Sequence, residues 1–160
     1  MTAIHYTVEA SDLHAHLFQV TLTIPEPAAQ QTVSLPVWIP GSYLVREFAK
    51  NLQNLQARQG RRLASLAQLD KCTWVITCNP GQPLVLSYAV YAFDTSVRTA
   101  WLDSQRGFFN GTSLCLRVHG QEAQPHQLQL NPVKGQAIWQ AATGLAPIKI
   151  DQKGFGLYQA

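Results

Sequence analysis

The stretch HLFQVTLTI, residues 16–24, decides the fold class of this 160-residue chain. Phe18, Val20, Leu22 and Ile24 alternate with polar residues, and side chains two positions apart point to the same face of an extended strand. Its β-branched and aromatic residues also have a high preference for strands. The stretch therefore predicts a β-strand.

Similar segments lie on both sides of it. Strands are predicted at residues 4–9, 16–24, 32–38, 73–77, 84–91, 113–118 and 127–130, with a shorter alternating piece at 147–151. Turn signals separate them, among them Pro40-Gly41, Gln59-Gly60 and Asn79-Pro80-Gly81. This order predicts a mainly β fold, either an antiparallel β-sandwich or a saddle-shaped sheet, with at most one or two short helices.

Residues 44–55 fit that scheme less well. Leu44, Phe48, Leu52 and Leu55 recur at helical spacing, and the local pattern favours one helix of about three turns. The same residues are compatible with a turn followed by a weakly alternating strand. Periodicity does not decide between the two over so short a span.

The composition is that of a packed globular protein, because 46% of the residues are hydrophobic and four are Trp. A chain of this length favours a single domain. The net charge of +3 is too small to indicate a nucleic-acid partner. No apolar run reaches the roughly 18 residues that span a bilayer, and the start does not look like a secretory signal. With an odd count of three cysteines, we expect a cytoplasmic protein without a membrane partner.

No catalytic motif is present in the sequence. It contains no His-Glu-x-x-His, no Gly-x-Ser-x-Gly, no P-loop and no dinucleotide fingerprint. His14 and His16 are two residues apart and could share one face of a strand, but no third ligand for a metal can be named. We therefore predict no catalytic and no metal-binding residue in this chain.

Two carboxylates, Asp94 and Asp103, lie in a dense polar and aromatic segment, FDTSVRTAWLDSQRGFFNG, residues 93–111. A general acid–base pair is conceivable. The structural interpretation is simpler: Asp94 begins a turn, and Asp103 pairs with Arg98 or Arg106.

Two longer segments together resemble a known family. They are LPVWIPGSYLVREFAKNLQ, residues 35–53, and YAVYAFDTSVRTAWLDSQRGFFNGTSLCL, residues 88–116. They look like the N-terminal domain of the glycyl aminopeptidase family, bacterial zinc metallopeptidases related to thermolysin. The likeness extends from IHYTVEA near the start to IWQAATGL at residues 138–145, so it covers nearly the whole chain.

The resemblance implies a parent with three parts: a β-rich N-terminal domain, a thermolysin-like catalytic domain carrying zinc, and a PDZ-like module. Such a parent removes N-terminal residues, preferably glycine and alanine, from peptides. Residues 1–160 are then one domain, cut from a longer chain whose catalytic domain follows Ala160. By this comparison residues 44–55 form a short turn and then a strand. We expect no cofactor in the fragment, zinc only in the missing catalytic domain, and no activity of the fragment alone.

The resemblance also implies an accessory role. An aminopeptidase holds a free N-terminus in a cleft with a closed end, and a β-domain packed on the catalytic domain can help supply that wall. Aromatic and arginine side chains are enriched at interfaces. The six candidate contact residues with the catalytic domain or the substrate cleft are therefore Arg98, Asp103, Arg106, Phe108, Phe109 and Asn110.

The segment VWIPGSYLVREF, residues 37–48, is interpreted as scaffold. Its defining residues are Trp38, Pro40, Gly41, Tyr43, Arg46, Glu47 and Phe48. Pro40-Gly41 should turn the chain, while Tyr43, Leu44 and Phe48 should pack into the core. Arg46 and Glu47 are sequence neighbours and should have separate partners.

An alternative function is an independent β-sandwich module that binds a peptide or a glycan. Exposed Trp38, Tyr43 or Trp101 would then form its binding platform.

Overall fold

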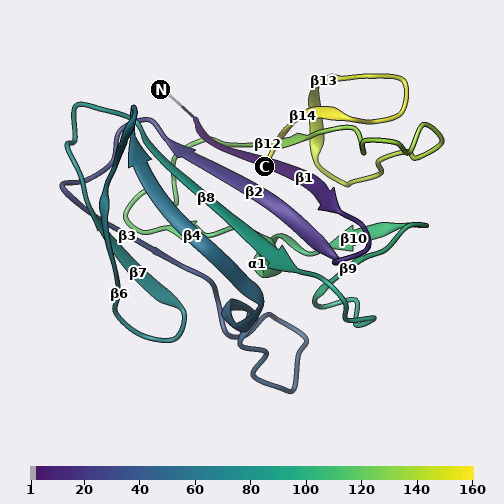
Figure 1. The fold of residues 1–160 in the computed structure, drawn as a ribbon, viewed down its shortest axis with the longest axis horizontal. Coiled ribbons are helices and arrows are strands. Elements are labelled where there is room, and N and C mark those ends of the chain that lie inside the picture. The colour runs from purple at the N-terminus through teal and green to yellow at the C-terminus, as the bar shows by residue number, and fades with distance from the viewer. Residues whose placement is uncertain (1–2) are drawn as a thin grey trace.

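A computed structural model describes residues 3–160, which form a mainly β domain (Figure 1). An eight-stranded sheet has the order β13-β14-β12-β1-β2-β8-β4-β5, a four-stranded sheet has the order β11-β3-β7-β6, and β9 and β10 form a separate hairpin. The elements are β1 (Ile4–Asp12), β2 (Leu17–Ile24), β3 (Gln30–Ser34), η1 (Phe48–Asn51), β4 (Leu52–Gln59), β5 (Arg62–Leu63), β6 (Ser65–Gln68), β7 (Thr73–Thr77), β8 (Leu84–Tyr91), β9 (Ala100–Leu102), β10 (Gly107–Phe109), α1 (Gly111–Leu114), β11 (Arg117–Val118), β12 (His126–Leu130), β13 (Ala146–Ile150) and β14 (Gly156–Gln159).

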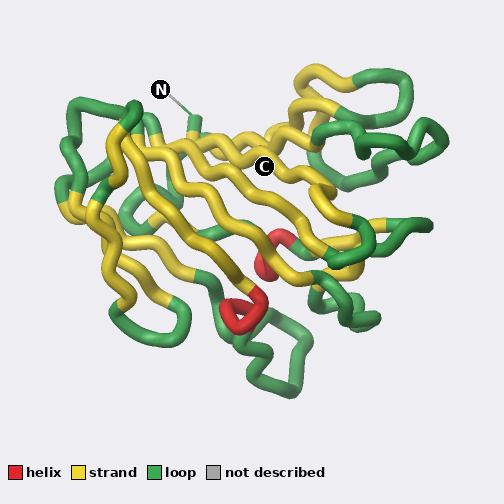
Figure 2. Tube along the Cα trace, viewed as in Figure 1, coloured by secondary structure: helices red, strands yellow, loops and turns green. Residues whose placement is uncertain are grey.

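The predicted fold class is confirmed. Strands dominate the trace of residues 3–160, and its two helical pieces, η1 and α1, have four residues each (Figure 2). Every strand pairing is antiparallel except that of β1 with β12, which is parallel. None of the helices in this part of the chain has the length and hydropathy that a membrane crossing needs.

Strand β2 lies near the middle of the large sheet, as its alternation predicts. Phe18, Val20, Leu22 and Ile24 are all buried, and the residues between them are partly exposed. The strand pairs with β1 on one side and β8 on the other. The turn before it is closed by Asp12, whose Oδ1 accepts hydrogen bonds from the amides of residues 14 and 15 at 3.0 and 2.8 Å.

The two sheets share one hydrophobic core. Leu22 and Leu86 of the large sheet and Val33 and Ile76 of the small sheet are each fully buried in the same cluster. Tyr88, also fully buried, is among its largest side chains. The core therefore lies on one face of the large sheet.

The helix predicted from local periodicity at residues 44–55 is wrong, and the turn followed by a strand is confirmed. Glu47 has a left-handed backbone with φ of 47°, which is incompatible with a continuous α-helix, and β4 begins at Leu52. A β-bulge then shifts the register between Gln53 and Gln56, where Asn54 has φ of 56°. The inserted residue interrupts the twofold alternation, which explains why the leucine spacing resembled that of a helix.

The strand predicted at residues 113–118 is only partly correct. The segment begins as α1, and only Arg117–Val118 forms a strand, β11. Two buried tyrosines take up its backbone groups: the Tyr88 hydroxyl donates to Leu114 O at 2.7 Å and accepts from Leu116 N, while the Tyr6 hydroxyl donates to Leu116 O. These partners are 26 or more positions away in sequence, so local pattern could not reveal them.

Candidate functional site

Residues 37–47, here called the exposed loop, begin with the predicted Pro-Gly turn. The amide of Ser42 donates to Ile39 O at 3.2 Å across Pro40 and Gly41. Gly41 has φ of +81°, the conformation that the third position of a type II turn requires. The turn prediction is confirmed.

Ser42 holds the exposed loop together from inside. Its side chain is buried, and its hydroxyl donates to Leu44 O at 2.9 Å and accepts from Leu44 N and from Arg46 Nε at 3.3 and 3.1 Å. Trp38 Nε1 donates to Ser42 O at 2.6 Å. At the base, Arg46 N donates to Val37 O at 2.7 Å. Hydrogen bonds therefore fix the shape of this loop, without burial of its apolar tip.

The tip of the exposed loop turns apolar side chains to solvent. Tyr43 is 102% exposed, Leu44 63% and Val45 67%. The prediction that Tyr43 and Leu44 pack into the core is wrong, whereas Phe48 is buried as predicted. Three adjacent exposed apolar residues on an ordered loop are typical of a surface that contacts a partner.

Arg46 and Glu47 have separate partners, as predicted. Arg46 contacts Ser42 inside the loop, while Glu47 lies 3.4 Å from Lys71 Nζ in an exposed ion pair. Exposed pairs of this kind add little stability. Neither residue forms a reactive pair with the other.

A second loop, residues 92–99, joins the exposed loop. Asp94 begins its turn by accepting the amide of Ser96 at 2.8 Å, as predicted. Arg98 reaches across and donates from Nη2 to Gly41 O at 2.9 Å. Val97 in the same loop is 71% exposed. A hydrogen bond therefore joins the two loops, and both of them expose apolar side chains.

Phe93 of the second loop is the middle ring of an aromatic stack with His16 and Trp101. The ring centroids of His16 and Phe93 are 3.9 Å apart, and those of Phe93 and Trp101 are 4.4 Å apart. Arg106 lies over Trp101, with its guanidinium carbon 5.9 Å from the ring centroid. These neighbours already cover part of the Trp101 ring, which leaves less of it open to a sugar or peptide.

Asp103 closes the β9–β10 turn, and the prediction that it pairs with Arg98 or Arg106 is wrong. Its Oδ1 accepts from the amides of Gln105 and Arg106 at 2.8 Å each, and its Oδ2 accepts from Trp101 Nε1 at 2.9 Å. These backbone hydrogen bonds are the main reason why the pKa of this carboxyl lies below its usual value. Asp103 thus has a structural role.

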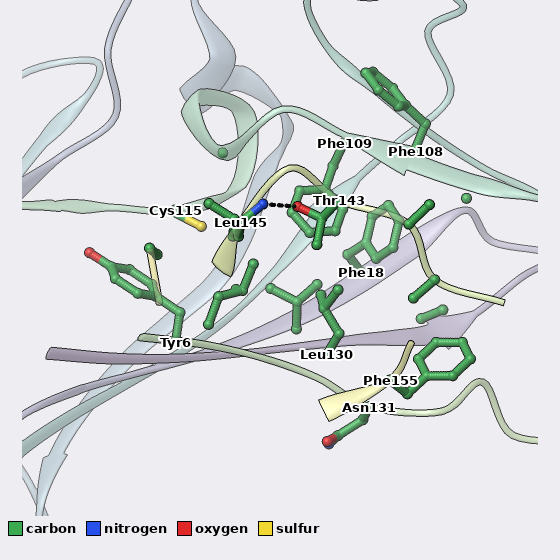
Figure 3. A pocket seen from close by; sticks show the side chains of 18 of the residues that line it. Tyr6, Phe18, Phe108, Phe109, Cys115, Leu130, Asn131, Thr143, Leu145 and Phe155 are labelled. Carbon is green, nitrogen blue, oxygen red and sulfur yellow. Dashed lines mark hydrogen bonds between the residues drawn. The ribbon is translucent and has the colours of Figure 1, made fainter. Parts of the chain in front are cut away.

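Phe108 and Phe109 lie on opposite faces of β10. Phe108 is opposite Trp101 in the hairpin and 46% exposed. Phe109 points the other way, packs edge-on against Phe18 with centroids 5.4 Å apart, and lines a cavity that Asn110 also borders (Figure 3). The structure thus separates the six candidate contact residues: Arg98 joins the two loops, Asp103 closes the hairpin turn, Arg106 lies over Trp101, and Phe108, Phe109 and Asn110 border the cavity, Phe108 from an exposed position.

The two histidines singled out by sequence do not share a strand face. His14 lies in the turn before β2, and His16 has φ of 59° and donates from Nδ1 to Leu102 O at 2.5 Å. Within residues 3–160, no three His, Cys, Asp or Glu side chains are grouped closely enough to hold a metal ion.

The sequence does not reveal that Leu44 and Val45 are exposed or that Ser42 is buried. The Pro-Gly turn before an apolar run is the available signal, and it predicts core packing instead. The hydrogen bonds of the Ser42 hydroxyl to Leu44 and Arg46 are not visible in residue spacing.

Comparisons with known proteins agree with this domain architecture. Residues 5–160 match the peptidase M61 N-terminal domain. The structure is similar to that of an aminopeptidase N family protein from Idiomarina loihiensis, with a TM-score of 0.94 and 40% sequence identity over 98% of this chain. The chain spans only 27% of the length of that protein. No curated protein sequence matches it. By its sequence and its fold, the chain belongs to the family of peptidase M61 N-terminal domains.

Proposed function

We propose that this chain is a non-catalytic accessory domain of a zinc-dependent glycyl or alanyl aminopeptidase, and that it packs on the catalytic domain. The observation that carries the proposal is the exposed loop, where Tyr43, Leu44 and Val45 face solvent while Ser42 keeps the backbone in place. Preformed apolar surfaces of this kind reduce the entropy lost on association.

The similar protein from Idiomarina loihiensis supports this proposal, since it is nearly four times longer than the matched region. A second domain on the same polypeptide is a partner whose effective concentration near this domain is always high. The catalytic domain is the proposed partner, and zinc and the catalytic groups belong to that domain. The accessory domain contributes one wall of the cleft that receives a peptide N-terminus.

The loops rather than β10 supply the proposed contact surface. Val97 lies on the second loop, which Arg98 ties to the exposed loop through Gly41 O. Phe108 is exposed on the nearby hairpin and can extend the surface. Phe109, by contrast, packs on Phe18, so its substitution would test the fold more than the interface.

The experiment uses the product of the complete reading frame, with the codons beyond Ala160. Replacing Tyr43, Leu44 and Val45 together by Ser should lower kcat/KM for a glycyl arylamide at least tenfold and weaken association of separately expressed domains. Leu63→Ser is the matched control, because Leu63 on β5 is 74% exposed and lies outside both loops. It should leave both measurements unchanged.

Three results would contradict the proposal: a reading frame that ends at codon 160, glycyl arylamide hydrolysis by the 160-residue chain alone, or a triple variant with intact association and activity. Saturable binding of an oligosaccharide or free peptide that Trp38→Ala abolishes would favour the independent binding module instead.

A further inference from the structure

A cavity of about 730 Å³ lies between the large sheet and the segments that face it. Tyr6, Phe18 and Leu130 form its wall on the sheet, and Phe109 and Leu145 face them from the β10 end and from the chain that follows β12 (Figure 3). Protein cores are close-packed and seldom leave voids larger than a few water molecules. This space is partly open to solvent, so it is a pocket rather than an internal void.

The lining is mostly apolar; its groups that can carry charge are the His126 imidazole and, in the 160-residue chain, the α-carboxylate of Ala160. Among the described residues that border the cavity there is no Asp, Glu, Lys or Arg. Three of the polar groups at its edge have partners in the protein: the Tyr6 hydroxyl donates to Leu116 O at 2.8 Å, Thr143 Oγ1 accepts from Leu145 N at 3.2 Å, and Asn131 Nδ2 donates to Glu9 at 2.7 Å. An anionic ligand would lose part of its hydration here without a Lys or Arg to pair with it.

The segment that follows β12, residues 131–145, forms one wall of the cavity. It contains no helix or strand, yet backbone contacts hold it in place. Ala141 N donates to Lys153 O at 2.8 Å. Gly154, with φ of +82°, approaches so closely that a Cβ there would lie 2.3 Å from Ala141 O. These contacts fix the backbone near Ala141 and keep the wall from moving inward.

A second contact holds the same wall to the hairpin. At Gly107 in β10, a Cβ would lie 3.6 Å from Trp139 Cζ3 and 3.4 Å from Phe18 Cζ. The Trp139 indole therefore lies beside Gly107 of β10. Contacts between the sheet, β10 and the segment that follows β12 therefore bound the cavity on these sides.

We propose that this cavity binds a neutral small molecule with a hydrocarbon body of two or three rings. Its volume falls within the range of about 300–1,000 Å³ that is typical of ligand pockets, which are mostly apolar. The aromatic side chains of Tyr6, Phe18, Phe109 and Trp139 suit flat rings. The exposed loop and the second loop do not line the cavity, so this ligand site shares only Phe108 with the proposed packing surface.

Two fluorescent probes with the same aromatic body test the preference for a neutral ligand. N-phenyl-1-naphthylamine is uncharged, whereas 8-anilinonaphthalene-1-sulfonate adds one sulfonate. The folded 160-residue chain should bind the neutral probe saturably at one molecule per chain, and the sulfonate at least tenfold more weakly. No saturable binding of the neutral probe, or equal affinity for both, would overturn the proposal.

Variants that fill the cavity locate the bound probe. Leu130→Trp and Val133→Trp each add an indole at a lining position. Each variant should lower the affinity for the neutral probe at least tenfold. Val133 lies in the irregular segment after β12, so Val133→Trp can still test the site if Leu130→Trp, on the strand, does not fold. Circular dichroism verifies that each variant is folded. Leu63→Trp on exposed β5 is the control for an added tryptophan. Unchanged affinity in the folded filling variants would place the probe elsewhere and refute the site.

Discussion

Strand β2 and the exposed loop use their apolar residues in opposite ways. In β2, every second side chain is buried, from Phe18 to Ile24. In the loop, Tyr43, Leu44 and Val45 are exposed, while the polar Ser42 is buried. The strand is thus stabilised by apolar burial and pairing with two neighbours, and the loop by hydrogen bonds to its own backbone. Apolar character alone therefore does not indicate which side chains stabilise this fold.

The largest expected difference in stability is between the same substitution, Leu to Ala, made in β2 and in the exposed loop. Leu22→Ala removes a fully buried side chain from β2 and should lower the free energy of unfolding by about 2–5 kcal/mol. Leu44→Ala in the exposed loop should change it by no more than about 0.5 kcal/mol. Urea unfolding at neutral pH measures both. Similar losses for the two variants would show that the loop packs against the core in solution.

A smaller loss in the free energy of unfolding is expected for Tyr88, a core residue whose hydroxyl forms hydrogen bonds with the backbone. Tyr88→Phe keeps the ring but leaves Leu114 O and Leu116 N without the hydroxyl that pairs with both. Leaving buried polar groups unpaired costs about 1–3 kcal/mol. Tyr43→Phe, at a fully exposed ring, is the matched control and should not alter the urea midpoint. An unchanged midpoint for Tyr88→Phe would mean that α1 is not held by this hydroxyl.

The smallest loss of stability is expected for Ser42→Ala, which tests whether the Ser42 hydrogen bonds hold the exposed loop in its shape. Ser42→Ala removes the hydroxyl that contacts Leu44 and Arg46, and should cost about 1 kcal/mol. The clearer signal is amide hydrogen exchange, which should become faster at Leu44 because its N–H loses its acceptor. Ser104→Ala, at an exposed position, should leave this exchange rate unchanged. Undiminished protection at Leu44 in Ser42→Ala would contradict the role assigned to Ser42.

Much of the fold was predictable from alternation. The segments around Phe18, Trp74, Leu86 and Leu128 form strands near the predicted positions. The failures have identifiable causes. At residues 52–59, the bulge at Asn54 breaks the alternation. After Gly111, the Tyr88 hydroxyl binds Leu114 O at the end of a short helical turn, and the Tyr6 hydroxyl binds Leu116 O just beyond it.

The candidate site was harder to predict than the fold. Arg98 does lie at the junction of the two surface loops. The adjacent residues Phe108 and Phe109 were predicted to act together, but consecutive residues on a strand point to opposite faces. Whether any of the six candidate contact residues touches a catalytic domain stays a prediction.

The sequence by itself determined the mainly β class, the Pro40-Gly41 turn and the likeness to glycyl aminopeptidase N-terminal domains. These depend on local spacing, backbone preferences and long unusual motifs, all of which are readable in one dimension. Only the tertiary structure decided that Tyr43 faces solvent, that Phe109 lines a cavity and that Arg98 reaches Gly41. The last two arise from contacts between residues that are distant in the chain, and the first from side-chain hydrogen bonds within the loop; neither kind of contact leaves a periodic pattern in the sequence.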